Sequence, residues 1–283
     1  MKEKELHRGV VPFLNCKDHL VSNETYEIML NKENEMLVTS PIPADLDKYY
    51  ESEDYQSHHN KKKTFLNFIY NTVKKKSFKR KESLFQTGVS GKSILDIGAG
   101  TGEFLLYCKD QNHEVTGTEP SKAARKVAEQ NGIILHHSLD QVKEKTFDVI
   151  TMWHVLEHVP NLYECLGHLK SMLRENGKLI IAVPNFKSYD ANHYKEFWAA
   201  YDVPRHLWHF SQKSIHCLFK SVEMKVTKTH PMKYDSFYVS LLSEKHKTGK
   251  TNYLKAFWVG LRSNRSARKT SEYSSLIYEL EHA

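Results

Sequence analysis

Three glycines stand at alternate positions directly after a short apolar run: Gly98, Gly100 and Gly102, in the stretch KSILDIGAGTGEFLLY that begins at Lys92. Glycines weaken any helix or strand that they interrupt, so this spacing indicates a turn where a ligand comes close to the backbone. The run before the turn is typical of a buried strand. The run after it is typical of a helix, whose first N–H groups are free to donate hydrogen bonds.

Two classes of ligand fit such a turn. A dinucleotide site uses G-x-G-x-x-G, whereas this turn reads G-x-G-x-G, and Glu103 stands where that site has a third small residue. A carboxylate there is an unfavourable neighbour for a pyrophosphate. A ligand with an ammonium and a sulfonium group instead gives a role to Asp96, just before the turn, which can hold a cationic amino-acid moiety. The second predicted strand ends in Glu119, which suits a ribose diol and so fits either ligand.

Apolar segments with the period of strands alternate along the chain with segments of helical period. Nearly all-apolar strands that alternate with helices indicate a parallel sheet covered on both faces, which is an α/β fold. The clearest helix begins at Pro160 and is expected to end at Gly177. The predicted strands are 93–98, 113–120, 133–137, 147–153, 178–185, 223–230 and 273–280, the last preceded by two helices within 235–268.

Four stretches resemble, in order and spacing, the successive motifs of class I S-adenosylmethionine-dependent methyltransferases: ILDIGAGTGEFL, VTGTEPS, FDVITMWHVLEHVPN and GKLIIAVPN. The resemblance covers roughly residues 80–230. It implies a Rossmann-like, seven-stranded, mostly parallel sheet whose last strand is antiparallel and lies between the fifth and the sixth. The chain then divides into an irregular N-terminal extension (1–60), a donor-binding core (61–234), and a helical insertion with the final strand (235–283).

The same resemblance implies S-adenosyl-L-methionine as the cofactor and S-adenosyl-L-homocysteine as its product. The methionine end is expected against Asp96 and the glycine turn, the ribose on Glu119, and the adenine beside Pro120. The end of the fourth strand is expected to border the sulfonium. The cofactor-binding residues so implied are Asp96, Gly98, Ala99, Gly100, Gly102, Glu119, Pro120, Ser138, Leu139, Trp153 and His154.

A second segment, FWAAYDVPRHLWHFS from Phe197, resembles a bacterial subgroup related to ubiquinone and menaquinone methylation and to some sugar methylation enzymes. That subgroup often carries an N-terminal zinc ribbon with two cysteine pairs, followed by a P-x-P…YY stretch. Here PIPADLDKYYESEDY fits the second feature, but Cys16 stands alone, so a ribbon-like region would be degenerate and lack its metal. The acceptor pocket is expected to contain Tyr201, Arg205, His206 and Trp208.

Each of these pocket residues also has a structural interpretation. Arg205 could pin an anionic group of a substrate, or it could pair with Asp202 beside it. Tyr201 and Trp208 could line the pocket or belong to an ordinary core. The two interpretations stay open at the level of the sequence.

Methyl transfer from a sulfonium is a direct in-line displacement, so the protein mainly aligns acceptor, methyl group and sulfur. A base is needed only if the acceptor loses a proton early. His154 and His206 are the predicted catalytic residues for that step, and His158 and His209 are alternatives; each could instead be structural. The chain has no H-E-x-x-H or C-x-x-C motif, and no catalytic metal is expected.

The predicted function is methyl transfer to a small-molecule acceptor, on oxygen rather than carbon. A non-catalytic donor-binding or partner-binding module is an alternative, because the ribbon cysteines are missing. RNA methylation is a second alternative, because the net charge is +7 and residues 61–81 are rich in lysine. The aromatic residues of that stretch repeat at core spacing, which favours an amphipathic helix, so nucleic acid is not the expected partner.

The stretch NYLKAFWVGLRSNRSARK within the insertion combines aromatic residues with a basic end. It is expected to form a lid or a contact in a homo-oligomer, and a membrane surface is the alternative. No apolar run has the length of a membrane span and the N-terminus does not read as a signal peptide, so a cytoplasmic location is expected.

Overall fold

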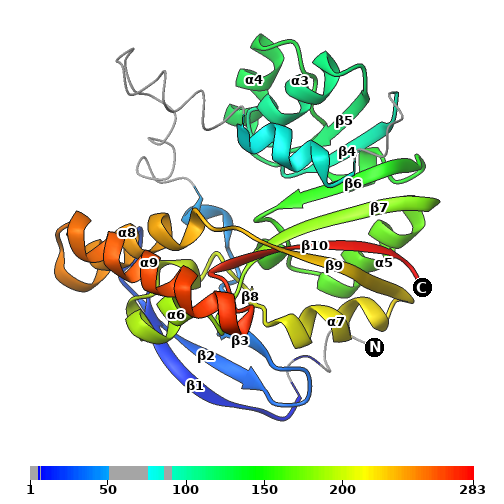
Figure 1. The fold of residues 1–283 in the computed structure, drawn as a ribbon. Helices are drawn as coiled ribbons and strands as arrows, with labels where there is room; N and C mark the ends of the chain where they lie inside the picture. Colours follow the sequence, from blue (N-terminus) through cyan, green and yellow to red (C-terminus); the bar gives the residue numbers. More distant parts are fainter. Residues whose placement is uncertain (1–5, 7, 51–75, 86–90) are drawn as a thin grey trace.

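Two sheets form the framework of the chain (Figure 1). The computed structural model describes residues 6, 8–50, 76–85 and 91–283. The larger sheet has the order β5-β4-β6-β7-β10-β9, and its first four strands pair in parallel. Its strands are β4 (Ser93–Ile97), β5 (Glu114–Thr118), β6 (Phe147–Trp153), β7 (Leu173–Pro184), β9 (Met224–Pro231) and β10 (Ser275–His282).

The last strand, β10, is antiparallel to both of its neighbours, β7 and β9. This confirms the predicted Rossmann-like α/β fold, with the final strand inserted between the fifth and the sixth. The prediction of seven strands is wrong for the described residues, because 133–137 form a single parallel bridge, from Thr118 to His136. Ile134 is 82% exposed while Ile133 and Leu135 pack inward, so this segment lies along the edge strand β5 without a ladder.

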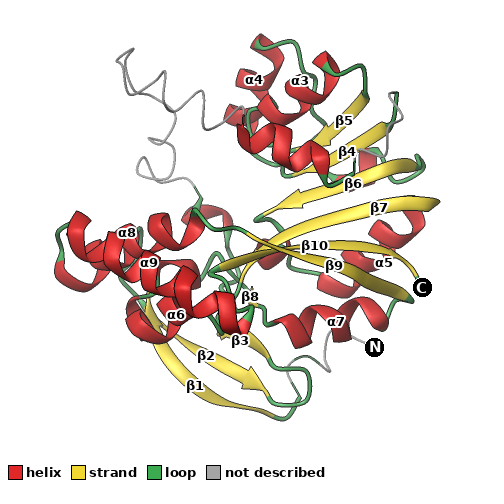
Figure 2. Ribbon diagram, viewed as in Figure 1, coloured by secondary structure: helices red, strands yellow, loops and turns green. Residues whose placement is uncertain are grey.

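Helices cover both faces of the larger sheet, as Figure 2 shows. α3 (Glu103–Asp110) and α4 (Lys122–Gln130) pack on one face, where Ile94, Val149 and Ile180 point. α5 (Leu162–Met172) and α7 (Gln212–Lys220) pack on the other, where Leu95 and Ile150 point. This alternation along each strand is what buries a parallel sheet on both sides.

The helix predicted to run to Gly177 ends earlier than expected. α5 stops at Met172, and Leu173 already pairs with Phe147 as the first residue of β7. A Cβ at Gly177 would lie 2.9 Å from the carbonyl oxygen of Arg174, so this glycine serves a tight backbone approach at the start of the strand rather than a helix end.

The N-terminal region is not irregular over residues 10–40, contrary to the prediction. β1 (Val10–Lys17), β2 (Thr25–Asn31) and β3 (Met36–Ser40) form an antiparallel meander, and β3 pairs with β8 (Trp208–His209) of the core segment. The lone Cys16 is buried, with its Sγ 3.2 Å from the carbonyl oxygen of Glu196. Most of the predicted helix over 61–81 lies outside the described residues, and 76–83 is helical.

A second apolar core joins regions that are distant in sequence. It contains Ile28 of β2, Tyr194 of α6 (Tyr189–Tyr194), Trp198, and residues of the helical insertion. The insertion itself is the pair α8 (Asp235–Thr248) and α9 (Tyr253–Thr270), as predicted. The N-terminal sheet and the insertion share this core, so they are not packed as separate domains. The division of the chain at residues 60 and 234 stays a prediction from the sequence.

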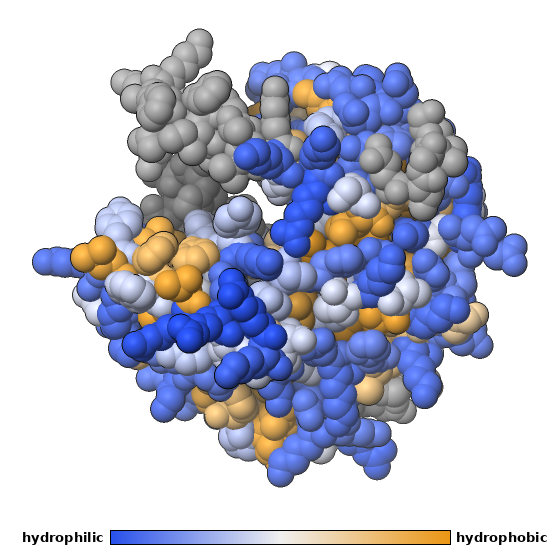
Figure 3. Space-filling model, viewed as in Figure 1, coloured by the Kyte–Doolittle hydropathy of each residue, from blue (hydrophilic) through white to orange (hydrophobic). Residues whose placement is uncertain are grey.

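The outer face of α9 carries exposed apolar side chains, seen at the left of Figure 3. Phe257 is 53% and Trp258 58% exposed, and Tyr253 and Leu254 are more exposed still. The C-terminal half of the same helix is basic. A lid, an oligomer contact and a membrane contact all stay predictions for this surface. Among the helices that the structure describes, none combines the length and apolar character needed to cross a bilayer.

Candidate functional site

The glycine turn lies at the carboxyl end of β4, and its three glycines have positive φ. A Cβ on Gly98 would lie 2.4 Å from the side chain of Val155, and a Cβ on Gly102 would lie 3.1 Å from Ile133. These two glycines therefore serve close packing within the protein. Gly100 differs, because a Cβ there would meet no described atom within 4 Å. The space beside Gly100 is open, as a ligand that approaches the backbone requires.

The side chain of Glu119, directly after β5, is hydrogen-bonded to this turn. Its Oε2 accepts a hydrogen bond from the backbone N–H of Gly100 at 2.9 Å, and its Oε1 accepts from Ser121 at 2.9 Å. Arg125 donates to the carbonyl oxygens of Glu119 and Pro120, at 2.7 Å each. Because each carboxylate oxygen has a second lone pair, a fixed Glu119 can still accept hydrogen bonds from two hydroxyls of a ribose.

Asp96 is the second carboxylate of the site and is 3% exposed. Its Oδ1 accepts a hydrogen bond from Thr151 Oγ1 at 2.6 Å. Burial raises the pKa of Asp96 to about 6, and the Thr151 hydroxyl and the charge of Lys81 oppose that rise. A further cation beside Asp96 would favour its charged form, which is what a donor with an ammonium group would supply.

Lys81 reaches the same region, although the sequence did not indicate it. Its Nζ lies 4.0 Å from the ring centroid of Trp153 and 5.3 Å from that of Phe104. Burial lowers the pKa of Lys81 to about 8, and the charge of Asp96 acts in the opposite direction. Two aromatic rings therefore already contact a cation, and one of them is Trp153, which the sequence predicts beside the sulfonium.

The other predicted cofactor residues lie at the same edge of the sheet. The N–H of Ala99 donates to the carbonyl oxygen of Thr118 at 2.9 Å, which ties the ends of β4 and β5 together. Ser138 and Leu139 lie at the start of the 3₁₀ turn η4 (Leu139–Gln141), after the bridge to β5. Trp153 is the last residue of β6. Ligands of open α/β sheets bind along this edge.

His154 lies between two carboxylates. Its Nδ1 is 3.4 Å from Glu157 Oε1 and its Nε2 is 3.2 Å from Asp235 Oδ2 of α8. Burial alone would lower the pKa of His154, but the hydrogen bonds and charges of Asp235 and Glu157 outweigh it and raise the pKa to about 10. An imidazole that is protonated at neutral pH donates rather than accepts, so this geometry does not support His154 as a proton acceptor.

We predict that His154 stays protonated at neutral pH and that Asp235→Asn lowers its pKa, because one of the two carboxylates is removed. The folded pKa lies above the unfolded value of about 6.5. The stabilisation from this group is therefore fully present below about pH 6.5 and is lost as the pH rises through about 10. NMR titration of the histidine Cε1–H signals measures this directly, with the exposed His216 of α7 as internal control. A wild-type His154 that titrates near pH 6.5 would contradict the assignment.

All four predicted pocket residues are buried, and the partners of three of them correct that part of the prediction. Tyr201 is 2% and Trp208 1% exposed, and the Trp208 Nε1 donates to the carbonyl oxygen of Val159 at 2.7 Å. The Tyr201 ring packs edge-on against Trp198, with centroids 5.0 Å apart. These aromatic side chains are core residues and offer no surface to an acceptor.

Arg205 is the third corrected residue. It is 1% exposed, donates from Nη2 to Asp202 Oδ1 at 2.6 Å, and lies 3.3 Å from Asp18 Oδ1. Asp18 follows β1 directly, so this ion pair joins the N-terminal sheet to the segment before β8. The alternative in which Arg205 pairs with Asp202 is the one that the structure shows.

The other three histidines considered as proton acceptors differ in their surroundings. His206, the fourth predicted pocket residue, is 8% exposed, and its Nδ1 lies 2.9 Å from the carbonyl oxygen of Ala200. His158 packs edge-on against it, with ring centroids 4.5 Å apart. His209 lies in β8 with its Nε2 3.1 Å from Thr39 Oγ1, and burial holds its pKa well below the usual value, so it is a neutral link between strands.

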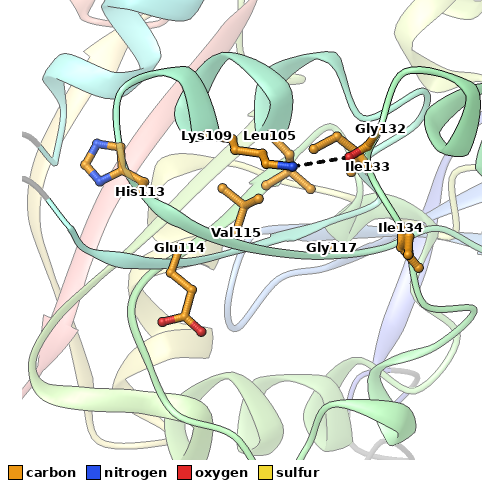
Figure 4. A pocket seen from close by; sticks show the side chains of 9 residues that line it. All are labelled: Leu105, Lys109, His113, Glu114, Val115, Gly117, Gly132, Ile133 and Ile134. Atoms are coloured by element: carbon orange, nitrogen blue, oxygen red, sulfur yellow. Dashed lines mark hydrogen bonds between the residues drawn. The ribbon is translucent and has the colours of Figure 1, made fainter.

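A groove of about 390 Å³ is lined by residues other than those of the glycine turn (Figure 4). It runs between α3 and the edge strand β5, and Lys109 reaches across it to the carbonyl oxygen of Gly132 at 3.4 Å. Its lining is mixed and contains none of the predicted site residues. The lining residues are Leu105, Lys109, His113, Glu114, Val115, Gly117, Gly132, Ile133 and Ile134.

Comparison with known proteins shows the family of this chain. Residues 71–229 match the family described as "Methyltransferase domain". A "Ubiquinone biosynthesis O-methyltransferase" of Actinobacillus pleuropneumoniae is 32% identical over 112 residues, which are 35% of this chain and 48% of the relative. An "Uncharacterized methyltransferase" of Alkaliphilus oremlandii is 36% identical over 101 residues, 33% of this chain and 46% of the relative. The chain thus spans about half the length of the curated relatives it matches.

A solved structure of similar fold covers more of the chain. Magnesium protoporphyrin IX methyltransferase from Synechocystis PCC 6803, with bound S-adenosylhomocysteine, superposes with a TM-score of 0.54. The alignment covers 83% of this chain and 97% of that one, at 13% identity. At this level of identity the comparison shows the shared fold.

Proposed function

Because the chain belongs to the family of S-adenosylmethionine-dependent methyltransferase domains, which its residues 71–229 match, we propose that it transfers a methyl group from this donor to an oxygen of a small-molecule acceptor. The observation that carries the proposal is the pair of carboxylates, Asp96 and Glu119, on both sides of the open Gly100. The choice of oxygen is supported by the name of the matching relatives, ubiquinone biosynthesis O-methyltransferases. The cytoplasmic location stays a prediction.

The donor supplies a methyl group that its sulfonium already activates, so the residues of this chain mainly bind and orient. Glu119 accepts hydrogen bonds from the ribose, while Asp96 and the backbone of the glycine turn hold the amino-acid end. The ring of Trp153 faces a cation, as the contact with Lys81 demonstrates. His154 lies between Glu157 and Asp235 and so connects the end of β6 to the start of α8.

The predicted proton acceptor among the described histidines is then His206. Its Nδ1 lies 2.9 Å from the carbonyl oxygen of Ala200, which can only accept, so Nδ1 carries a proton, and its Nε2 lies 3.9 Å from Asp202 Oδ2. In the neutral ring, Nε2 can take a proton from an acceptor hydroxyl.

Incubation with methyl-labelled donor tests the proposal. We expect label in phenolic or other hydroxyl compounds of a small-molecule panel, and no loss of label when cell extract is first treated with RNase. Label confined to RNA would contradict a small-molecule acceptor. Donor binding without transfer to any panel or extract component would contradict catalysis and favour a binding module.

A further inference from the structure

The ammonium group of Lys81 is held by aromatic rings. Its Nζ lies 4.0 Å from the ring centroid of Trp153 and 5.3 Å from that of Phe104. Within the part of the chain that the structure describes, no hydrogen bond or ion pair fixes this Nζ to another residue. Asp96 of β4 and Asp235 of α8 act on it through their charges. The contact with Trp153 is therefore what positions the ammonium.

The helix over residues 76–83, the unlabelled cyan helix of Figure 1, fixes where the Lys81 side chain begins. The next residue, Glu82, is 3% exposed and accepts a hydrogen bond from the hydroxyl of Tyr107 in α3 at 2.8 Å. Because this neighbour is tied to α3, a movement of Lys81 away from Trp153 involves its side chain and leaves the helix in place.

Trp153 is also the residue predicted to border the sulfonium of the donor. It is the last residue of β6, which pairs in parallel with β4, the strand of Asp96. Its ring packs edge-on against Phe104, with centroids 5.8 Å apart, so its edge is engaged and a face contacts the Lys81 ammonium. A sulfonium and an ammonium are both cations that such a face attracts, and two cations in contact with one ring repel each other.

Given the proposed function, on which this inference rests, we propose that Lys81 competes with the sulfonium of the donor for the Trp153 ring. Lys81 then determines how the site discriminates between S-adenosylmethionine and S-adenosylhomocysteine. The two ligands share their adenosine and their amino-acid end, and they differ in the methyl group and the positive charge on sulfur. A cation on the ring therefore opposes the donor and not the product. To bind the donor, the protein turns the Lys81 side chain away or releases its proton.

The competition ends when the methyl group is transferred. The acceptor oxygen forms the new O–C bond while the C–S bond of the donor breaks, and the sulfur keeps that electron pair and becomes a neutral thioether. Lys81 then returns to the ring of Trp153 without repulsion from the ligand. The product is thus expected to bind more tightly than the donor and to inhibit the reaction. Replacing Lys81 by an uncharged residue should weaken that inhibition relative to donor binding.

The charge of Lys81 changes within the pH range of an ordinary assay. Burial lowers the pKa of Lys81 to about 8. Asp96 of β4, Asp235 of α8 and Cys108 of α3 act in the opposite direction. A neutral amine does not compete with a sulfonium, so donor affinity relative to product affinity should rise as the pH increases through about 8. Because arginine keeps its charge throughout this range, that rise should be smaller in Lys81→Arg.

Calorimetric titration with S-adenosylmethionine and with S-adenosylhomocysteine at pH 7 tests the competition. In Lys81→Met, the ratio of donor affinity to product affinity should rise about tenfold, since the ring face is left to the sulfonium. Lys81→Arg keeps the cation and should keep the wild-type ratio within about twofold. The matched control is Lys79→Met, which changes an exposed lysine of the same helix and should leave both affinities within about twofold. Thermal melting verifies that each variant is folded.

An unchanged or lower ratio in Lys81→Met would overturn the inference. Equal weakening of both ligands in that variant is one such result, and it would assign Lys81 to the amino-acid end that the ligands share. Because the ratio compares two ligands of one site, it is separable from the proposed function. Wild-type protein that binds neither ligand would contradict the proposed function together with the competition, whereas binding of both with one ratio in every variant would contradict the competition alone.

Discussion

Replacing Glu119 by alanine is expected to weaken the binding of S-adenosylmethionine at least about 100-fold. The carboxylate is positioned to accept from two ribose hydroxyls, and hydrogen bonds to a charged group contribute about 1.5–3 kcal/mol each. Loss of both corresponds to two or more factors of ten, since about 1.4 kcal/mol is a factor of ten. The variant also removes the acceptor of the Gly100 and Ser121 N–H groups, which loosens the turn. Calorimetric titration with the donor measures the change.

The matched control for that experiment is Glu114→Ala. Glu114 lies at the start of the same strand, β5, with an exposed side chain far along the strand from the turn. Its replacement should change donor affinity less than about twofold. Equal affinities of the Glu119 variant and this control would contradict the role of Glu119.

Replacing Arg205 by alanine is expected to lower the free energy of unfolding by about 3–5 kcal/mol, because it leaves a buried carboxylate without its counter-ion. The guanidinium is 1% exposed and binds Asp202 through two nitrogens, while Asp18 reaches it from the N-terminal sheet. Burial would raise the pKa of Asp202, but the charge of Arg205 lowers it, so the acid is ionised at neutral pH. Urea denaturation at neutral pH measures the loss.

Arg174→Ala serves as the matched control, because Arg174 also pairs with an aspartate, Asp148, at 2.8 Å. Its side chain is 50% exposed, and exposed ion pairs contribute about 0–1 kcal/mol. A stable Arg205→Ala protein with weakened acceptor binding would contradict the structural role and restore the substrate role that the sequence also allowed.

Hydrophobic periodicity predicted most of the larger sheet because its central strands are buried on both faces. The largely apolar runs of β4, β6 and the C-terminal half of β7 are typical of buried strands. The segment 133–137 has the same apolar appearance, but it lies along an edge strand and pairs at a single residue. The strands of residues 10–40 were missed because they are mixed in polarity and are buried by distant partners, among them Trp198.

The residues proposed to hold the donor were accessible to sequence reasoning, and several of their tertiary neighbours were not. The glycine turn, Asp96 and Glu119 are each next to a strand end, so local pattern and sheet topology place them. Lys81 stands in a lysine-rich stretch that resembles a solvated helix face, and its contact with Trp153 depends on tertiary packing. Glu157 and His158 lie close to His206, which comes from a segment far along the chain, so no motif of fixed spacing reveals this group.

A crystal structure with bound S-adenosylhomocysteine tests the central claim most directly. The account predicts its ribose hydroxyls on the Glu119 carboxylate and its amino-acid end beside Asp96, with the ligand passing over the open backbone at Gly100. Density for the ligand at any other place, with protein atoms filling the space beside Gly100, would contradict it.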